Sequence, residues 1–323
     1  MIELAYRQGS HRFALTSGGV NYRVQAHASV LDAMKHAEER KAWPRHICSS
    51  LRTENAGFHG TPDWSTAAML ATRGWPEGRS MLRKAVAFMP KAAHRDRIYQ
   101  WDIAGAFPDA ARASAGAPDC MMDDHPTDMK PTQAVRVIVS MATPWTTGLD
   151  EFVNRGAAIL SAVEAAEAVG HRVEVVAEET AIGLNDGVSL SILLKAAGQP
   201  ADRDSLAFFL IHPSSLRRIF FALLETEPTL EHFCCGYGAP ACQPVELRPP
   251  GAIYLPSFDT GEYADASRAF KIVKATFTEA GCAVSFQPYP PAYHPWIRHL
   301  KKCYAKRFRL LRRKPLLTRN VPA

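Results

Sequence analysis

Residues 140–148 form a polar loop in which several side chains able to bind a ligand lie close together. The loop follows an apolar run, residues 135–139, of the kind found in buried parallel strands, and it precedes a long helical pattern. Ligands of open α/β sheets bind at the carboxyl ends of strands and at helix N-termini. The candidate ligand-binding hydroxyls are those of Ser140, Thr143, Thr146 and Thr147. The alternative is that they only cap the helix and turn the chain.

A second group of polar side chains lies at residues 212–218, within a strongly apolar stretch. It contains a histidine, two serines and two arginines. Arginine pairs hold phosphate or carboxylate groups, so His212 and Arg217 join the candidate ligand-binding residues. The competing interpretation is a buried His212 bonded to the backbone, with Arg217 and Arg218 exposed. A catalytic role needs a partner that the sequence does not identify, so the catalytic residues remain unknown.

Metal-ligand patterns are weak in this chain. His232, Cys234, Cys235 and Cys242 offer soft ligands, but adjacent cysteines rarely bind one ion and no second CxxC completes a set. The acidic pairs at 123–124 and 178–179 lie in or beside predicted loops, where solvated surface is the commoner explanation. We therefore expect no metal site.

Common catalytic and cofactor motifs do not occur in the sequence. It has no GxGxxG, GxxxxGK[ST], HExxH, GxSxG or paired CxxC. We therefore expect no cofactor and favour a protein that acts by binding rather than by catalysis. The alternative is an enzyme with a site at the carboxyl edge of the parallel sheet, around residues 140–147.

The last part of the chain is strongly basic. Residues 301–323 contain nine lysines and arginines and no acid, which leaves a net charge of about −3 for the first 300 residues out of +6 overall. Trp296, Tyr304 and Phe308 lie among these cations, a combination that suits the backbone and bases of nucleic acid. The candidate nucleic-acid contacts are Arg298, Lys301, Lys302, Lys306, Arg307, Arg309, Arg312, Arg313 and Lys314.

Two other interpretations of the basic segment stay open. As a helix, it would align Leu300, Tyr304, Phe308 and Leu311 in one apolar stripe, which could bind the body of the protein or a protein partner. It could also be a solubilising tail without a partner. The expected partners are therefore protein or nucleic acid, and the oligomeric state is not predicted.

Composition points to a globular protein of the cytoplasm. The hydrophobic fraction is 47% and the charged fraction 22%. No apolar run approaches the roughly 18 residues of a membrane span, and the first residues lack the pattern of a signal peptide. Seven cysteines without regular spacing do not suggest a secreted disulfide framework. We expect a cytoplasmic protein with no membrane contact.

The elements that would position these groups form an α/β fold. A strand at 135–139, a helix from Leu149 to Val169 that Gly170 ends, and a strand at 171–176 predict a βαβ crossover. The expected architecture is a three-layer Rossmann-like domain over residues 131–297. A mixed, loop-rich α+β region, 1–130, precedes it, and a basic tail, 298–323, follows it.

The N-terminal region contains shorter signals. Residues 30–39 read as a helix, and Thr61 is a candidate cap for a second helix that ends at Gly74. A strand is expected at 98–103. Residues 105–131 are rich in proline and glycine, which predicts an irregular loop or an arm across a surface.

The βαβ order and the position of the 140–148 loop resemble a von Willebrand factor A-type domain over about residues 133–180. In that family the first strand ends in Asp-x-Ser-x-Ser, which holds a divalent cation. The corresponding positions here are Ser140, Ala142 and Pro144. The resemblance therefore implies a degenerate or absent metal site.

A second resemblance covers more of the chain. The segments GTPDW from residue 60, GWPEG from 74, DIAGA from 102, GAPDCM from 116 and NRGAA from 154 occur in this order. They are similar to an uncharacterised protein family of bacteriophage and prophage genomes. The resemblance implies a phage-type protein, located in the host cytoplasm, and no particular mechanism.

Overall fold

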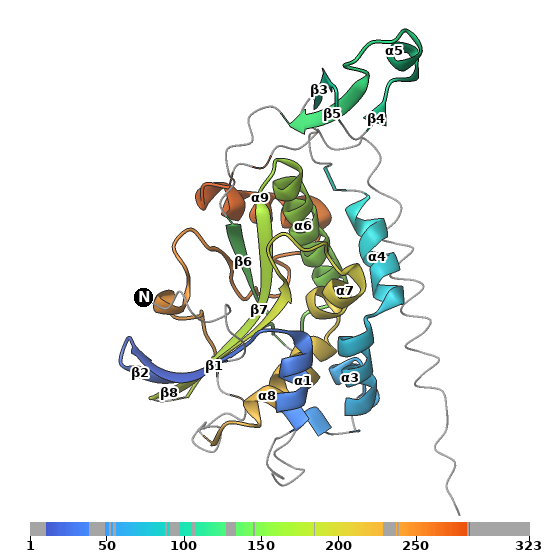
Figure 1. Ribbon diagram of the computed structural model, residues 1–323. Coiled ribbons are helices and arrows are strands. Elements are labelled where there is room, and N and C mark those ends of the chain that lie inside the picture. Colours follow the sequence, from blue (N-terminus) through green and yellow to red (C-terminus); the bar gives the residue numbers. More distant parts are fainter. Residues whose placement is uncertain are drawn as a thin grey trace, which may run out of the picture.

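The computed structural model describes residues 11–38, 49–51, 53, 56–87, 89–90, 97–104, 107–126, 134–144, 146–183, 185–228, 237, 239–282 and 284. Its main sheet has the strand order β1-β2-β8-β7-β6-β10, and the short strand β9 (Ala239–Pro240) pairs with β7 beyond the end of β6 (Figure 1). The fold is a mixed α/β fold, as the sequence predicts.

The predicted βαβ unit is present. Strand β6 (Ala134–Ser140), helix α6 (Leu149–Ala168) and strand β7 (Arg172–Ile182) follow one another, and β6 and β7 are parallel. Gly170 adopts φ 97° just after α6, a left-handed conformation that suits glycine at a helix end. On the other side of β6 lies β10 (Ile253–Leu255), also parallel. The carboxyl ends of β6, β7 and β10 therefore point the same way.

The sheet departs from a Rossmann-like pattern after β7. The chain turns directly into β8 (Asp186–Lys195), which is antiparallel to β7, rather than crossing over through a helix. Beyond β8 lies β2 (Val20–His27), parallel to it, and then β1 (His11–Ser17), antiparallel to β2. Strands from the first 30 residues thus share one sheet with β6–β8.

The helices gather on one side of this sheet. Helix α6 contacts α9 (Ala266–Glu279), α4 (Pro76–Val86) and α7 (Arg203–Ile211), and α7 contacts α3 (Trp64–Arg73). Helix α1 (Val30–Glu38) joins α3 to α8 (Phe221–Leu224), which completes an unbroken series (Figure 1). The described residues therefore form two layers, and the expected three-layer arrangement is not what they show.

The two faces of the sheet differ in chemistry. The helical face carries Val137, Val139, Val175 and Ala177 into the hydrophobic core, as alternation along a strand requires. The second face carries Ile138 and Val176 and then polar side chains toward the carboxyl end, among them Glu178, Thr180, Ser189 and Ser191, all buried. The segment that contains η4 (Val245–Leu247) reaches this second face, because Arg248 stacks on Tyr254 of β10.

The N-terminal helices follow the predicted positions with one change. Helix α1 matches the predicted residues 30–39, and Gly74 ends α3 with φ 83°. The cap of α3 is Asp63, whose carboxylate accepts a hydrogen bond from the N–H of Thr66 at 2.7 Å. Thr61, the predicted cap, instead donates to the carbonyl of Asp63. The helix begins at Trp64, two residues later than a cap at Thr61 requires.

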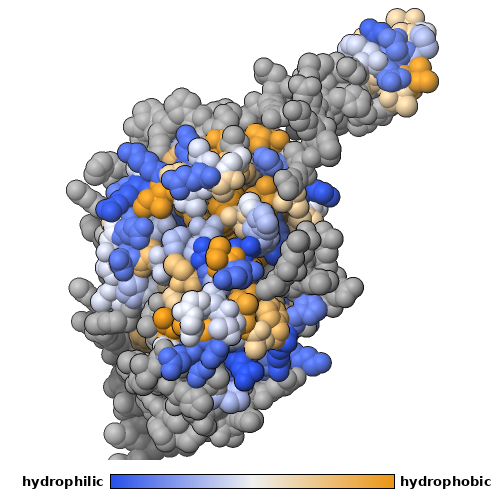
Figure 2. All heavy atoms as spheres, turned by 90° about the vertical axis from the view of Figure 1, so that its left-hand side faces the viewer, coloured by the Kyte–Doolittle hydropathy of each residue, from blue (hydrophilic) through white to orange (hydrophobic). Residues whose placement is uncertain are grey.

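Residues 97–104 and 107–126 belong to a small unit that stands away from the main body in two perpendicular views (Figures 1 and 2). The predicted strand is β3 (Arg97–Asp102), and it pairs with β5 (Met121–Pro126). The region expected to be irregular contains β4 (Phe107–Pro108) and α5 (Ala110–Ser114) as well as β5. Pro108 and Pro126 therefore lie within short strands, and Pro118 lies between two elements.

No single described helix is long and apolar enough to cross a membrane. Helix α7 and the following pair η2 (Ser215–Phe220) and α8 together have the length and composition of a broken span, bent by 80°. Phe208, Phe209 and Phe220 of this pair are fully buried in the hydrophobic core.

Candidate functional site

A buried arginine closes the carboxyl edge of the sheet between β6 and β10. Arg155, on the second turn of α6, donates to the carbonyl of Ser140 at 2.8 Å and to those of Leu255 and Pro256 at 3.3 and 2.8 Å. Its guanidinium also lies 4.8 Å from the Phe258 ring centre. Arginine stays charged in proteins, so this side chain supplies fixed donors to two strand ends. The place where α/β sheets bind ligands is occupied here by the chain itself.

The candidate hydroxyls lie around this closed edge. The hydroxyl of Thr146 is 2.6 Å from that of Thr260, which ties the loop to the segment after β10. Thr143 and Thr147 have buried hydroxyls without a hydrogen-bond partner among the described residues. Ser140 is fully buried and lies opposite Glu178 in the β6–β7 pairing. The loop therefore brings these four residues together at one edge of the sheet.

Glu178 lies at the centre of a polar cluster on the second face. Thr180 donates to one oxygen of its carboxylate, and the Tyr254 hydroxyl donates to the other at 3.3 Å. Tyr254 is itself held by the N–H of Gln243 at 3.0 Å. Burial raises the pKa of Glu178 to about 7, although these hydrogen bonds act in the opposite direction. A carboxyl group with this pKa can give or take a proton near neutral pH.

Glu179 points to the helical face and is also buried. Burial raises the pKa of this carboxyl well above its ordinary value, and the charge of Glu178 acts in the same direction. Its Oε2 has no hydrogen-bond partner among the described residues. The prediction that the pair at 178–179 is solvated surface is therefore wrong. The reason is that β7 continues to Ile182, about six residues past the predicted strand end, so both acids lie in a central strand.

Glu178→Gln is expected to change how stability depends on pH. In the folded protein the pKa of Glu178 is raised from 4.5 to about 7, so the folded state holds a proton that the unfolded state has lost. Its contribution to stability is present below pH 4.5 and is lost as the pH rises toward 7. The shift corresponds to about 3 kcal/mol. Urea unfolding measures the free energy of unfolding of both proteins at pH 4.5 and 7.5. The value for the variant minus that for wild type should be about 3 kcal/mol larger at pH 7.5 than at pH 4.5. The same difference at both pH values would contradict the assignment.

His212 lies at the end of α7, and its contacts described below include no residue of the loop 140–148. Its ring stacks on Phe208 at 5.2 Å and meets Trp75 edge-on at 4.5 Å. The N–H of Ser214 donates to Nδ1 at 3.1 Å, which leaves the proton on Nε2. Burial lowers the pKa of His212 to about 4, so the ring is neutral at physiological pH. These contacts match the interpretation of a buried histidine bonded to the backbone.

The two arginines after His212 are buried, contrary to the expectation that they are exposed. Arg218 is fully buried and donates to the carbonyls of Ser50 at 2.6 Å and Thr61 at 3.0 Å. Arg217 donates to the carbonyl of Phe58 at 2.6 Å and lies over its ring. The two side chains therefore hold Ser50, Phe58 and Thr61 against η2. The burial of these two arginines depends on backbone carbonyls far along the chain. The sequence around residues 217 and 218 does not indicate such partners, so this burial could not be predicted.

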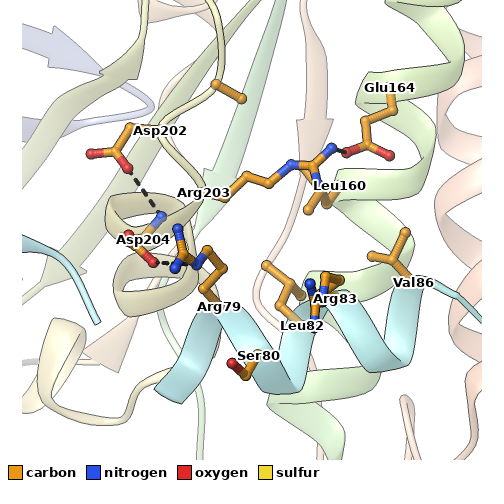
Figure 3. A pocket seen from close by; sticks show the side chains of 11 residues that line it. Arg79, Ser80, Leu82, Arg83, Val86, Leu160, Glu164, Asp202, Arg203 and Asp204 are labelled. Atoms are coloured by element: carbon orange, nitrogen blue, oxygen red, sulfur yellow. Dashed lines mark hydrogen bonds and ion pairs between the residues drawn. The ribbon is translucent and has the colours of Figure 1, made fainter. Parts of the chain in front are cut away.

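A cavity of about 630 Å³ lies between α4, α6 and α7 (Figure 3). Three arginines and three acids surround it, and its apolar wall consists of Leu82, Val86, Leu160 and Ala201. The charged residues are Arg79, Arg83, Arg203, Glu164, Asp202 and Asp204. Sequence reasoning missed this site. The only available signal was Arg79 and Arg83 at a spacing of four residues in a predicted helix.

A family model described as a domain of unknown function, DUF7192, matches residues 17–284. The chain belongs to this family. The expectation of an uncharacterised family is thus confirmed in its general form, while the match supports neither the phage assignment nor the von Willebrand A-type resemblance. No curated protein and no solved structure matches the chain.

The DUF7192 region contains Arg155, the Glu178 cluster and the cavity, and it ends before the basic segment. The candidate nucleic-acid contacts at 298–314 and the cluster His232, Cys234 and Cys235 lie outside the described residues. Within the described part of the chain, no three His, Cys, Asp or Glu side chains form a metal-ligand set.

Proposed function

We propose that this DUF7192 protein acts by binding nucleic acid, with the basic segment 298–323 as its principal contact. The observation that carries the proposal is the charge of this segment, which has nine lysines and arginines and no acid in residues 301–323. Cations at this density release counterions from a phosphate backbone, which is the main source of affinity in such complexes. Tyr304 and Phe308 add surfaces on which bases stack.

Two features of the folded part support binding over catalysis. Arg155 fills the carboxyl edge between β6 and β10, where a substrate of an α/β enzyme would bind. His212 is held neutral between aromatic rings and bonded to the backbone. The contacts of Arg155 and His212 explain their burial, so a catalytic role is not needed to account for either residue.

The test is binding of a fluorescent single-stranded oligonucleotide to the full chain between 50 and 200 mM salt. If six or more phosphates are neutralised, affinity for the single strand should fall by about 300-fold or more over this range. Deleting residues 298–323, which lie outside the family match, should abolish the binding. Equal affinity before and after deletion would refute the proposal.

A charge-neutral variant of the same segment provides the matched control. It replaces the nine lysines and arginines of residues 301–323 by glutamine and keeps Leu300, Tyr304, Phe308 and Leu311. Loss of binding in this variant assigns the effect to charge. Retained binding would instead favour the apolar stripe and a protein partner.

A second candidate function is an enzyme with its site around residues 140–147. The observation that favours it is the set of polar groups at this edge. The hydroxyls of Thr143 and Thr147 are buried without partners, and Glu178 titrates near neutral pH beside Ser140. Buried hydroxyls without partners and a buried carboxyl group reduce the stability of the fold. Groups of this kind are often found at ligand-binding or catalytic sites.

We also propose a phage or prophage origin, on the ordered segments at residues 60–64, 74–78, 102–106, 116–121 and 154–158. Identifying the genes that lie beside this one in the genome tests the proposal. Structural genes would indicate a role in the virion, and replication or host-takeover genes would indicate regulation inside the host cell.

A further inference from the structure

We propose that the cavity between α4, α6 and α7 binds one nucleotide unit, with Arg83 as the ligand of its phosphate. The inference deepens the proposed function and rests on it, because it gives the folded domain a defined contact with the strand that the basic segment attracts. The cavity has a volume of about 630 Å³, within the range of about 300–1,000 Å³ of small-molecule sites.

The charged groups around the cavity divide into those that are already paired and those that are free. Arg79 of α4 pairs with Asp204 of α7 at 3.1 Å, and Arg203 of α7 pairs with Glu164 of α6 at 2.7 Å (Figure 3). The carboxylate of Asp202 accepts from the N–H of Asp204, which caps α7. Each acid of the rim therefore already has a donor.

Arg83 is the remaining cation of the rim. It is exposed, and within the described residues no hydrogen bond or ion pair engages its side chain. It lies one helical turn after Arg79 on α4, so both side chains belong to the same face of the helix. Ser80, also on the rim, has an exposed hydroxyl that is free in the described structure. The donors left over at this site are thus a guanidinium and a hydroxyl.

These donors and the wall beside them define the class of ligand. A guanidinium matches the geometry of a phosphate and binds it through two parallel N–H groups. The apolar wall of Leu82, Val86, Leu160 and Ala201 offers a surface for a sugar and base, and neighbouring arginines stack on bases. A ligand with a phosphate and an attached planar group would contact both the donors of the rim and the apolar wall.

The experiment uses the full chain and two probes, adenosine monophosphate and a short 5′-phosphorylated oligothymidylate. Arg83→Gln removes the free cation. Arg73→Gln is the matched control, because Arg73 is an exposed arginine on α3 that does not line the cavity. Calorimetry for the mononucleotide and fluorescence anisotropy for the strand give the affinities.

Arg83→Gln should weaken both probes about tenfold and reduce the salt dependence of strand binding by about one phosphate, while Arg73→Gln leaves mononucleotide affinity unchanged. Equal mononucleotide affinity in the two variants, or no mononucleotide binding at all, would overturn the inference while leaving the basic segment as a binding site. Mononucleotide binding that depends on Arg83, with no binding of the strand, would support the cavity and refute the proposed function.

Discussion

Arg155→Met is expected to lower the free energy of unfolding by about 3–5 kcal/mol. The guanidinium donates to three carbonyls at the ends of β6 and β10, two of which belong to the buried residues Ser140 and Leu255. Methionine fills most of the volume but supplies no donor, so the carbonyls of Ser140 and Leu255 lose their partner away from water. Phe258 and Tyr263 also lose the cation above their rings.

Urea denaturation measures this effect, and Arg172→Met is its control. Arg172 is exposed at the start of β7, so the same change in chemistry should alter stability by less than about 0.5 kcal/mol. A loss below 1 kcal/mol in Arg155→Met would show that the strand ends find other donors, and that the carboxyl edge is open to ligands after all.

Arg218→Met is expected to cost about as much, about 3–5 kcal/mol, for a different reason. Arg218 joins the carbonyls of Ser50 and Thr61 to η2, and its charge faces Asp63 and Glu225. Glu225 is fully buried and accepts hydrogen bonds from the Ser50 backbone and side chain. Removing the cation takes away a charge that offsets this buried carboxylate, which is the costly case for a buried ion.

The neighbouring arginine gives a matched comparison. Among the contacts of the described residues, Arg217→Met breaks the hydrogen bond to the carbonyl of Phe58 and the contact with its ring, so we expect a loss of about 1–2 kcal/mol. Hydrogen exchange at residues 56–61 should accelerate in Arg218→Met more than in Arg217→Met. Equal destabilisation of the two variants would contradict the role assigned to the Arg218–Glu225 charges.

Local patterns in the sequence were enough to predict the elements around the candidate site. The apolar run before Ser140, the helical spacing up to Gly170 and the following apolar run gave β6, α6 and β7 because each signal lies within one element. The position of the 140–148 loop at the carboxyl end of β6 followed from that order. The antiparallel turn from β7 to β8 did not, because the strand was predicted to end at residue 176. That hides the short connection from Ile182 to Asp186, which only antiparallel strands allow.

The chemistry of the site depended on contacts that sequence does not contain. Arginines are usually exposed, so Arg155 and Arg218 read as surface residues until their carbonyl partners, far along the chain, are known. Glu178 and Glu179 were misjudged because the length of β7 was underestimated. The cavity needs three helices from two distant parts of the chain, and no single segment indicates it.

The pairing of β2 with β8 has a consequence for how the protein is made. His27 pairs with Ile192, so the N-terminal hairpin is complete about 160 residues before its partner strand exists. At roughly 5–20 residues per second, a ribosome takes about 10–30 s to supply it. Throughout that interval one edge of β2 offers unpaired backbone groups to other nascent chains. Slow synthesis or crowded ribosomes should therefore lower the yield of folded protein.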